Sequence, residues 1–266
     1  MDSGVSLVSM PYSKILCSND LTNKEYEEEK VPTMPQETTF SHTESHSSTD
    51  AVILPYEVTD EYYIEQLPQL KKKYLYNFIK RMADIILAFL GLVITAVPML
   101  VIAVMIKIKM GGTVFYRQTR LGLNGKPFQI LKFRTMAMDA EVGGAQWSEG
   151  SHDSRITALG AALRQYRLDE LPQFFNVLSG TMSLVGPRPE RPCFYDAFET
   201  YIHGFSQRLA VKPGITGLAQ VNGGYSLRPE EKILHDVEYI KKRSLWLDFI
   251  ILLKTVEIVL HHRDAK

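Results

Sequence analysis

The chain has 266 residues, a length that allows one or two domains, and its formal charge at pH 7 is zero. This balance conceals a division, because residues 1–70 hold 13 Asp and Glu against 3 Lys, a formal charge of −10, and residues 71–266 therefore carry +10. Two cysteines, Cys17 and Cys193, give no disulfide framework, and the N-terminus lacks the basic and apolar regions of a cleaved signal peptide. Two reduced thiols in a cytoplasmic compartment are therefore the expectation, and the basic body favours an anionic partner such as lipid headgroups, phosphates or nucleic acid.

Residues 1–70 are predicted to be an acidic, disordered extension. They are rich in Ser, Thr and Glu and are interrupted by Pro32, Pro35 and Pro55. Such a composition buries too little apolar surface to offset the entropy of ordering the chain. The stretch AVILPYEV, at 51–58, is a candidate docking segment, but an undocked tail is the favoured interpretation.

A basic flank and an apolar segment follow over residues 71–110. From Ile85 to Ile106 there are 22 residues without a charged side chain, enough to cross a hydrocarbon core of about 30 Å. Pro98 removes a backbone hydrogen bond within this run and predicts a kink. Lys and Arg lie on both sides of the run, and such residues tend to stay on the cytoplasmic side. These residues alone leave a spanning helix and a re-entrant helix both open.

Residues 111–266 are predicted to form a helix-rich α+β catalytic domain. The stretch 114–136 has two runs of β-branched and aromatic residues around an Asn-Gly dipeptide, which predicts a β-hairpin. The stretch 156–168 carries its apolar residues on one helical face. At 244–262 the sequence predicts an amphipathic helix, for which the membrane interface and the protein core are both open.

Two adjacent carboxylates, Asp169 and Glu170, mark the candidate active site. They stand in LDELPQFFNVL, where Pro172 is tolerated in the first turn of a helix that is expected to begin near Asp169. Asp169 would then be the N-cap, and a capping Asp beside a solvated Glu is the purely structural interpretation. Arg164 precedes the pair, and Arg188 follows it in the proline-fixed turn GPRPE. Carboxylates, arginines and a helix start together predict a site for a phosphate and a divalent metal, and a carboxylate can also attack phosphorus.

Several motifs occur in one order: KRMADI, KFRTM, DSRIT, LDELPQ, NVLSG, MSLVGPRP and KPGITGLAQVNG. Together they resemble the bacterial sugar transferases, which are monotopic polyprenyl-phosphate phosphoglycosyl transferases. The similarity runs from about Lys80 to about Leu260, so the chain resembles the minimal form of the family with an added N-terminal extension. One motif alone would be weak evidence, whereas their joint occurrence is highly specific.

The resemblance implies a reaction and its residues. Sugar-1-phosphate would pass from a UDP-sugar to undecaprenyl phosphate with release of UMP, as the first membrane step in building an exopolysaccharide, capsule or other glycan. Asp169 would be the nucleophile that forms a covalent phosphosugar intermediate, and Glu170 would hold Mg²⁺. The expected substrate-binding residues are Arg164, Arg188, Lys132 and Arg134.

The resemblance also implies a membrane arrangement. Pro98 falls on the family's helix-breaking proline, which favours a re-entrant helix at the cytoplasmic membrane with the catalytic domain on the cytoplasmic face. Membrane lipids are then the expected partners, and nucleic acid is not. Two positions depart from the family pattern: Val97 stands where a Ser often precedes the proline, and Ser154 replaces the proline of Asp-Pro-Arg-Ile-Thr. The first departure makes a sharp break less certain to form.

Two alternatives to the covalent enzyme stay open. Asp169 could act as a general base for direct transfer, or the chain could be a membrane-tethered scaffold whose acidic extension recruits partners. No motif reads a pattern of sugar hydroxyls, so the sequence does not identify the sugar, and residues 191–210 are the candidate specificity segment.

Overall fold

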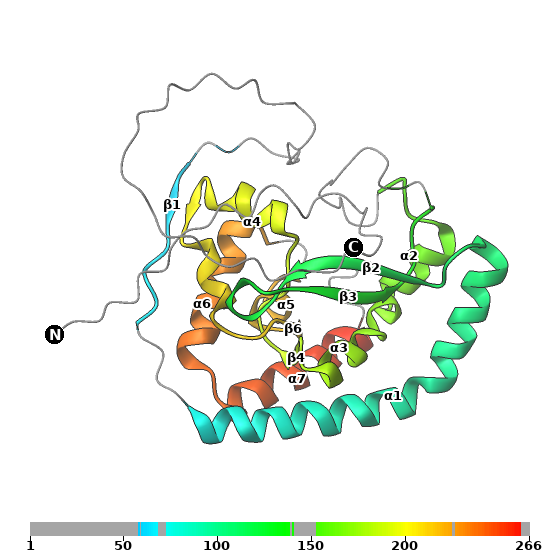
Figure 1. Ribbon diagram of the computed structural model, residues 1–266, viewed down its shortest axis with the longest axis horizontal. Coiled ribbons are helices and arrows are strands. Elements are labelled where there is room, and N and C mark those ends of the chain that lie inside the picture. The colour runs from blue at the N-terminus through cyan, green and yellow to red at the C-terminus, as the bar shows by residue number, and fades with distance from the viewer. Residues whose placement is uncertain are drawn as a thin grey trace, which may run out of the picture.

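The computed structural model describes residues 58, 60–68, 73–138, 140, 153–224 and 227–261, which form a helix-rich body with small sheets (Figure 1). The helices are α1 (Tyr74–Met110), α2 (Ala158–Gln165), α3 (Gln173–Ser179), α4 (Pro192–Glu199), α5 (Leu218–Val221), α6 (Pro229–Lys242) and α7 (Leu245–His261). The strands are β1 (Tyr62–Tyr63), β2 (Phe115–Leu121), β3 (Pro127–Phe133), β4 (Ser183–Val185), β5 (Ile202–His203) and β6 (Gly214–Thr216). This architecture confirms the helix-rich α+β class.

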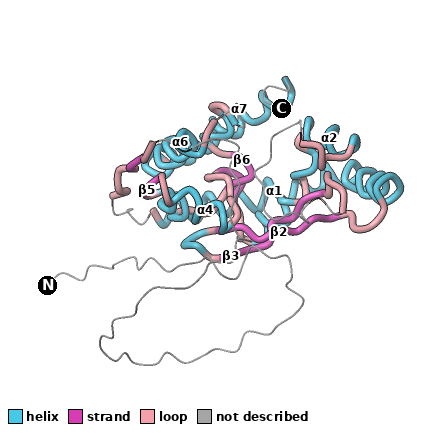
Figure 2. Tube along the Cα trace, turned by 90° about the horizontal axis from the view of Figure 1, so that it is seen from above, coloured by secondary structure: helices cyan, strands magenta, loops and turns pink. Residues whose placement is uncertain are grey.

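Each sheet in the described part of the chain has two strands. β2 and β3 pair antiparallel with Phe115 opposite Phe133, which confirms the predicted hairpin. Asn124 and Gly125 between them have left-handed φ values of 56° and 73°, the conformation that an Asn-Gly turn favours. Figures 1 and 2 show the hairpin running across the molecule from the side of α4 to the side of α2.

The apolar segment forms α1, a helix of 37 residues, and no other helix among the described residues is long and apolar enough to cross a membrane. Figure 1 shows that α1 follows one side of the body and then bends to follow an adjacent side. Pro98 lies inside the helix, where the missing N–H and the ring's clash with the preceding turn account for a bend. Thr95 Oγ1 also donates to the Gly91 carbonyl at 2.6 Å, a local bond that tends to bend helices.

Both arms of α1 contact the same globular body. In the first arm the buried Asp84 accepts a hydrogen bond of 3.0 Å from the backbone N–H of Leu184 in β4. In the second arm Ile102 and Ile106 are buried in a cluster with Phe133 of β3. A globular domain therefore fills the inner side of the bend.

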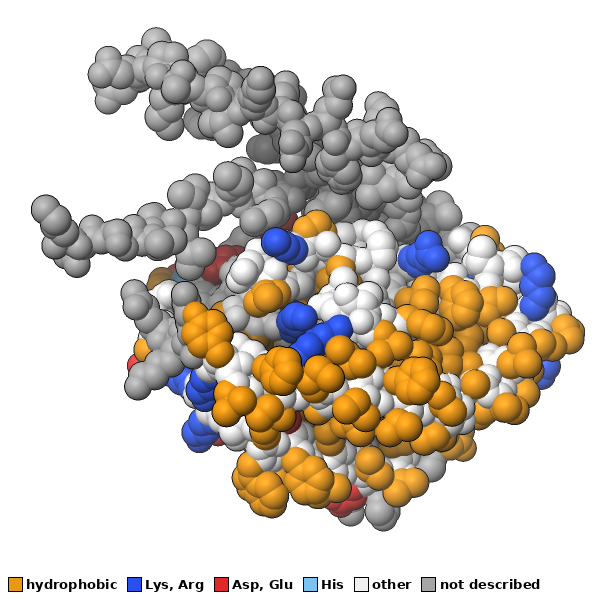
Figure 3. Space-filling view, turned by 60° about the horizontal axis from the view of Figure 1, so that its bottom comes forward, with side chains coloured by type: hydrophobic (Ala, Val, Ile, Leu, Met, Phe, Trp, Pro, Cys, Tyr) orange, Lys and Arg blue, Asp and Glu red, His pale blue; other side chains and the backbone are white. Residues whose placement is uncertain are grey.

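The outer surface of α1 and much of α7 is apolar. Figure 3 shows hydrophobic side chains gathered in a broad band on the face along which α1 runs. On α7, Trp246 and Leu260 are each 68% exposed, whereas Ile251 is fully buried. The sequence left the core and the membrane interface both open as locations for this helix. One face of α7 is buried in the core, and the opposite face is exposed and available to a membrane.

The glycine-proline motifs have a packing role at β4 and β6, which pair parallel. A Cβ on Gly214 would lie 2.1 Å from the backbone nitrogen of Gly186, and a Cβ on Gly217 would lie 2.2 Å from the Gly186 carbonyl oxygen. Only glycine permits this approach of two backbones. The contact fixes the start of the GPRPE turn, which carries Arg188.

Part of the acidic extension lies against the catalytic domain. Tyr62 donates a backbone hydrogen bond of 2.7 Å to Tyr201, and Ile64 donates one of 2.9 Å to His203, so that β1 adds to β5. Ile64 also packs against a core cluster that includes Phe205. Residues 60–68 thus differ from the rest of the extension, because Ile64 and Leu67 pack against a core cluster and β1 pairs with β5. Disorder of residues 1–57 stays a prediction. Residues 51–57 of the candidate docking segment at 51–58 lie outside the described residues.

Candidate active site

The segment between α2 and α3 carries the two adjacent carboxylates. The helix α2 ends at Gln165, Arg167 follows with a left-handed φ of 53°, and Leu168–Glu170 then form a 3-10 turn. The helix α3 begins after Pro172, and no side chain caps it. The prediction that Asp169 is an N-cap is therefore wrong, because the carboxylates occupy a separate turn that the proline divides from α3. Asp169 and Glu170 are each only 7% exposed.

Glu170 is held by two cations from distant parts of the chain. Lys132 Nζ from β3 lies 2.9 Å from Glu170 Oε1, and Arg188 Nη2 lies 2.5 Å from the same oxygen. Burial favours the neutral acid, but the charges of Arg188 and Lys132 outweigh it and hold the pKa of Glu170 well below its usual range. The structure thus brings together three residues that the sequence proposed for one site.

Asp169 has the opposite environment. No described residue donates a hydrogen bond to its carboxylate, and burial, followed by the negative charge of Glu170, raises the pKa of Asp169 to about 6. The positive charges of Lys132, Arg164 and Arg188 partly oppose this rise. At pH 7 the group is mainly a carboxylate that is poorly solvated and not engaged, and such a group can attack an electrophile.

Two of the predicted substrate contacts lie in different places. Arg164, in the last turn of α2, is close enough to Asp169 to affect its pKa, and its Nε donates to Thr135 Oγ1 at 3.0 Å. Arg134 instead donates from Nη2 to the carbonyls of Met110 and Gly111 at the end of α1. Its role as a substrate contact stays a prediction.

The turn that carries Arg188 is supported by a buried ion pair that sequence reasoning missed. Arg208 donates to the backbone carbonyl of Arg188 at 2.9 Å and lies 2.7 Å from Asp236 in an ion pair whose side chains are 2% and 1% exposed. The Arg208 guanidinium also lies 4.8 Å from the ring centroid of Phe205. Arg208 and Asp236 stand in no chemical motif, so their partnership could be found only from the fold.

A second ion pair supports the far end of the same turn. Arg120 of β2 lies 3.0 Å from Glu190, and the backbone N–H of Leu121 donates to the Glu190 carbonyl at 3.1 Å. The hairpin thus carries Lys132 on β3 and contacts the Arg188 turn through β2. This arrangement can bind a polyanion beside a reactive carboxylate.

Comparisons with known proteins show the family of the chain. The family described as bacterial sugar transferase matches residues 75–262. The chain is 44% identical over 204 residues to the UDP-N-acetylgalactosamine-undecaprenyl-phosphate N-acetylgalactosaminephosphotransferase of Aeromonas hydrophila, which covers 76% of this chain and 48% of that protein. It is 44% identical over 191 residues to the UDP-glucose:undecaprenyl-phosphate glucose-1-phosphate transferase of Xanthomonas campestris pv. campestris, covering 70% of this chain and 40% of that protein.

A third relative is matched over more of its length. The UDP-glucose:undecaprenyl-phosphate glucose-1-phosphate transferase of Caulobacter vibrioides is 43% identical over 192 residues, which are 70% of this chain and 71% of that protein. The chain spans about half or less of the first two relatives, and the matched part contains the carboxylates, the hairpin and the Arg188 turn. The chain therefore belongs to the bacterial sugar transferase family.

Proposed function

We propose that the protein transfers a sugar-1-phosphate from a UDP-sugar to undecaprenyl phosphate, with release of UMP and a covalent phosphosugar on Asp169 as the intermediate. The names of the relatives support the substrate classes, since they pair a UDP-sugar with undecaprenyl phosphate. Relatives of equal identity are named for N-acetylgalactosamine and for glucose, so the sugar is left unassigned. The observation that carries the covalent step is the buried, ionisable and unengaged carboxylate of Asp169.

The proposed chemistry has two steps. A carboxylate oxygen of Asp169 attacks the phosphorus that bears the sugar, the bond from this phosphorus to the bridging oxygen breaks, and UMP leaves with the electron pair. An oxygen of undecaprenyl phosphate then attacks the same phosphorus, and Asp169 departs as a carboxylate. The division lets UMP leave before the lipid substrate reacts.

The cations around the carboxylates would bind the diphosphate. Arg188 presents a guanidinium that can donate hydrogen bonds to two phosphate oxygens, and Lys132 and Arg164 add positive charge near Asp169. Arg188 and Lys132 already balance Glu170, so this residue can stay ionised beside a substrate of the same sign. The remaining positive charge favours an anionic leaving group.

Mg²⁺ is the cofactor that we propose for this site, with Glu170 as its protein ligand. The described residues contain no group of three or more His, Cys, Asp and Glu side chains that could hold a metal. The adjacent carboxylates nevertheless fit Mg²⁺, which commonly uses one or two carboxylates and completes its shell with substrate phosphates and water. When bound there, the ion would neutralise charge on the diphosphate.

The proposed location is the cytoplasmic face of the membrane, with α1 re-entrant. Both arms of α1 contact one body, through Asp84 on the first arm and Ile106 on the second, and that body carries the buried ion pair of Arg208 and Asp236. A helix that crossed the bilayer would separate its two ends by about 30 Å of hydrocarbon. The contacts support a helix that enters and leaves on one side.

Covalent labelling tests the proposal. The full chain in detergent or nanodiscs is incubated with UDP-sugar labelled with ³²P in the phosphate next to the sugar, with Mg²⁺ and without undecaprenyl phosphate. We expect stoichiometric label on the protein, chased by added undecaprenyl phosphate and absent from Asp169→Asn. Normal turnover without label would instead favour Asp169 as a general base, a role that a pKa of about 6 also suits.

A further inference from the structure

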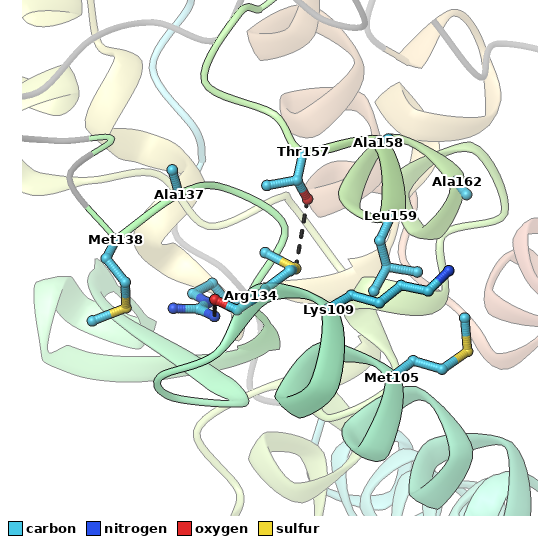
Figure 4. A pocket seen from close by; sticks show the side chains of 10 residues that line it. Met105, Lys109, Arg134, Ala137, Met138, Thr157, Ala158, Leu159 and Ala162 are labelled. Carbon is cyan, nitrogen blue, oxygen red and sulfur yellow. Dashed lines mark hydrogen bonds between the residues drawn. The ribbon is translucent and has the colours of Figure 1, made fainter.

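A cavity of about 620 Å³ lies between the end of α1 and the start of α2, and neither Asp169 nor Glu170 lines it. Its walls are mostly apolar and include Met105, Met110 and Met138 (Figure 4). The volume falls within the range of about 300–1,000 Å³ that is usual for ligand pockets. Flexible methionine side chains suit a ligand with a flexible apolar part.

Arg134 supplies the cavity with a buried charge that is only partly satisfied. Its side chain is 5% exposed, and Nη2 donates to the last carbonyls of α1. Its Nε and Nη1 have no acceptor among the described residues. A Cβ on Gly112 would lie 2.9 Å from Arg134 Nη1, so this glycine leaves space beside the nitrogen. Buried guanidinium donors without acceptors are costly, which indicates an anionic ligand.

One wall of the cavity continues a surface of α1 that is available to lipid. Met105 lies on the same helical stripe as Val101, Val104 and Ile108, which are 51%, 48% and 77% exposed. An acyl chain lying along this stripe would reach the cavity at Met105. The polar end of the same molecule would then lie near Arg134.

The opposite wall and the arrangement of charges limit the kind of anion. The first turn of α2, at Ala158 and Leu159, lines the cavity, and a helix start favours negative charge. Figure 4 shows Lys109 and Arg134 extending in opposite directions, so a single anion would meet one of these cations. A singly charged phosphodiester matches one guanidinium better than a phosphate monoester or a diphosphate does.

We propose that this cavity binds the headgroup of an anionic glycerophospholipid, with its phosphodiester on Arg134 and an acyl chain along the stripe of Met105. This site does not include Asp169 or Glu170, and it gives Arg134 a lipid phosphodiester as its partner in place of the predicted substrate. It would tie the bend of α1 to the bilayer. The chemistry needs only hydrogen bonds and apolar contact, and no bond is made or broken.

Photocrosslinking of the full chain in nanodiscs tests the site. The nanodiscs contain phosphatidylcholine and a trace of phosphatidylglycerol with a diazirine on its acyl chain, and peptide mass spectrometry locates the adducts. We expect adducts on Met105 or Leu159. Ala158→Trp fills the cavity from an exposed position and should reduce them about tenfold, whereas Ala161→Trp, exposed on the same helix outside the cavity, should leave them unchanged.

Arg134→Gln and competition complete the test. Loss of a charge-assisted hydrogen bond predicts about tenfold weaker capture in Arg134→Gln. Unlabelled phosphatidylglycerol should displace the probe, and inorganic phosphate should not. The proposal is overturned if Ala158→Trp captures as much lipid as the wild type, if both tryptophan variants lose it equally, or if undecaprenyl phosphate displaces the probe as well as phosphatidylglycerol does.

Discussion

Asp169 and Glu170 are adjacent in the chain and have opposite pKa shifts. Burial raises the pKa of both carboxyls. Glu170 forms ion pairs with Lys132 and Arg188, which lower its pKa strongly, whereas Asp169 is affected only by the charges of these residues at longer range. One carboxyl therefore stays ionised at any ordinary pH, and the other titrates near neutrality. Such a division supports the proposal that Glu170 holds the metal and that Asp169 is the nucleophile.

The first prediction at this scale is the pH dependence of the covalent step. Because the pKa of Asp169 is raised to about 6, lowering the pH through 6 converts the proposed nucleophile to the neutral acid. We expect the second-order rate constant for phosphosugar labelling to fall about tenfold per pH unit well below the pKa. Initial rates of labelling between pH 5 and 8 measure this fall. A flat profile down to pH 5 would contradict the assignment.

The second prediction concerns stability. The folded pKa of Asp169 lies above the ordinary value of 3.8, so its favourable contribution is complete below pH 3.8 and is lost as pH rises through about 6. At pH 7 Asp169→Asn should therefore have a free energy of unfolding that is higher by roughly 1–3 kcal/mol, and so a higher melting temperature. The same variant should lose transfer activity. The gain should shrink at pH 4 in calorimetric melts.

A control of opposite sign accompanies that variant. Arg155 lies 2.5 Å from Asp153 and, through its hydrogen bond, lowers the pKa of Asp153 below the usual value. The ionised form of Asp153 therefore stabilises the fold above the unfolded pKa, and this stability is lost as pH falls through the lower folded pKa. Asp153→Asn should melt at a lower temperature at pH 7. An equal gain from both variants would show that the Asp169 effect is not its pKa.

At the scale of elements, the turn after β4 depends on α6 through Arg208 and Asp236. Asp236→Leu leaves Arg208 buried without its partner and should lower the free energy of unfolding by about 3–5 kcal/mol. Arg208→Met/Asp236→Leu replaces the pair by apolar groups and should recover most of that loss. Denaturant titrations measure both.

The activity of the double variant shows whether Arg208 only stabilises the fold or also positions Arg188. The methionine cannot donate to the Arg188 carbonyl, so the turn loses a hydrogen bond of 2.9 Å even where stability returns. We expect KM for the UDP-sugar to rise several-fold in the double variant. Recovery of both stability and wild-type KM would mean that Arg208 has no part in placing Arg188.

The elements also show which features a sequence can predict. The hairpin could be predicted because an Asn-Gly turn fixes the register of the two strands beside it. The helices at 156–168 and 244–262 could be predicted from the local spacing of their apolar residues. The N-cap assignment for Asp169 failed because a left-handed Arg167 precedes a separate 3-10 turn, and α3 begins only after Pro172. The pairs that support Arg188 join residues from β2, η4 (Phe205–Ala210) and α6, which local pattern cannot relate.

At the scale of the whole molecule, α1 acts as a frame around the catalytic domain. Its first arm is tied to α7 by Lys80, which lies 3.0 Å from Asp248, and Tyr76 donates to the same carboxylate at 3.0 Å. Tyr239 of α6 donates to Asp248 at 2.8 Å and also to the carbonyl of Val185 in β4. The first arm of α1 and the strand that leads to Arg188 thus share one network of hydrogen bonds.

This frame gives the last prediction, the topology of α1. Both arms contact one polar body, so both ends of the helix should lie on the cytoplasmic side. We replace Cys17 and Cys193 and introduce single cysteines by Tyr74→Cys at one end, Lys107→Cys at the other and Val97→Cys at the bend, all at exposed positions. A membrane-impermeant maleimide should label both ends in inside-out vesicles and neither end in intact spheroplasts.

The cysteine at Val97 and a second substitution, at Pro98, distinguish a re-entrant helix from a spanning one. The side chain at Val97 is 71% exposed, yet it lies in the apolar run, so a cysteine there should react with the reagent only after detergent is added. Adding Pro98→Ala restores the hydrogen bond that the proline removes, which should straighten α1 and pull Ile106 away from Phe133. In that variant the cysteine at Lys107 should lose its labelling in inside-out vesicles. Labelling of the two ends from opposite sides in the unmodified helix would establish a spanning segment instead.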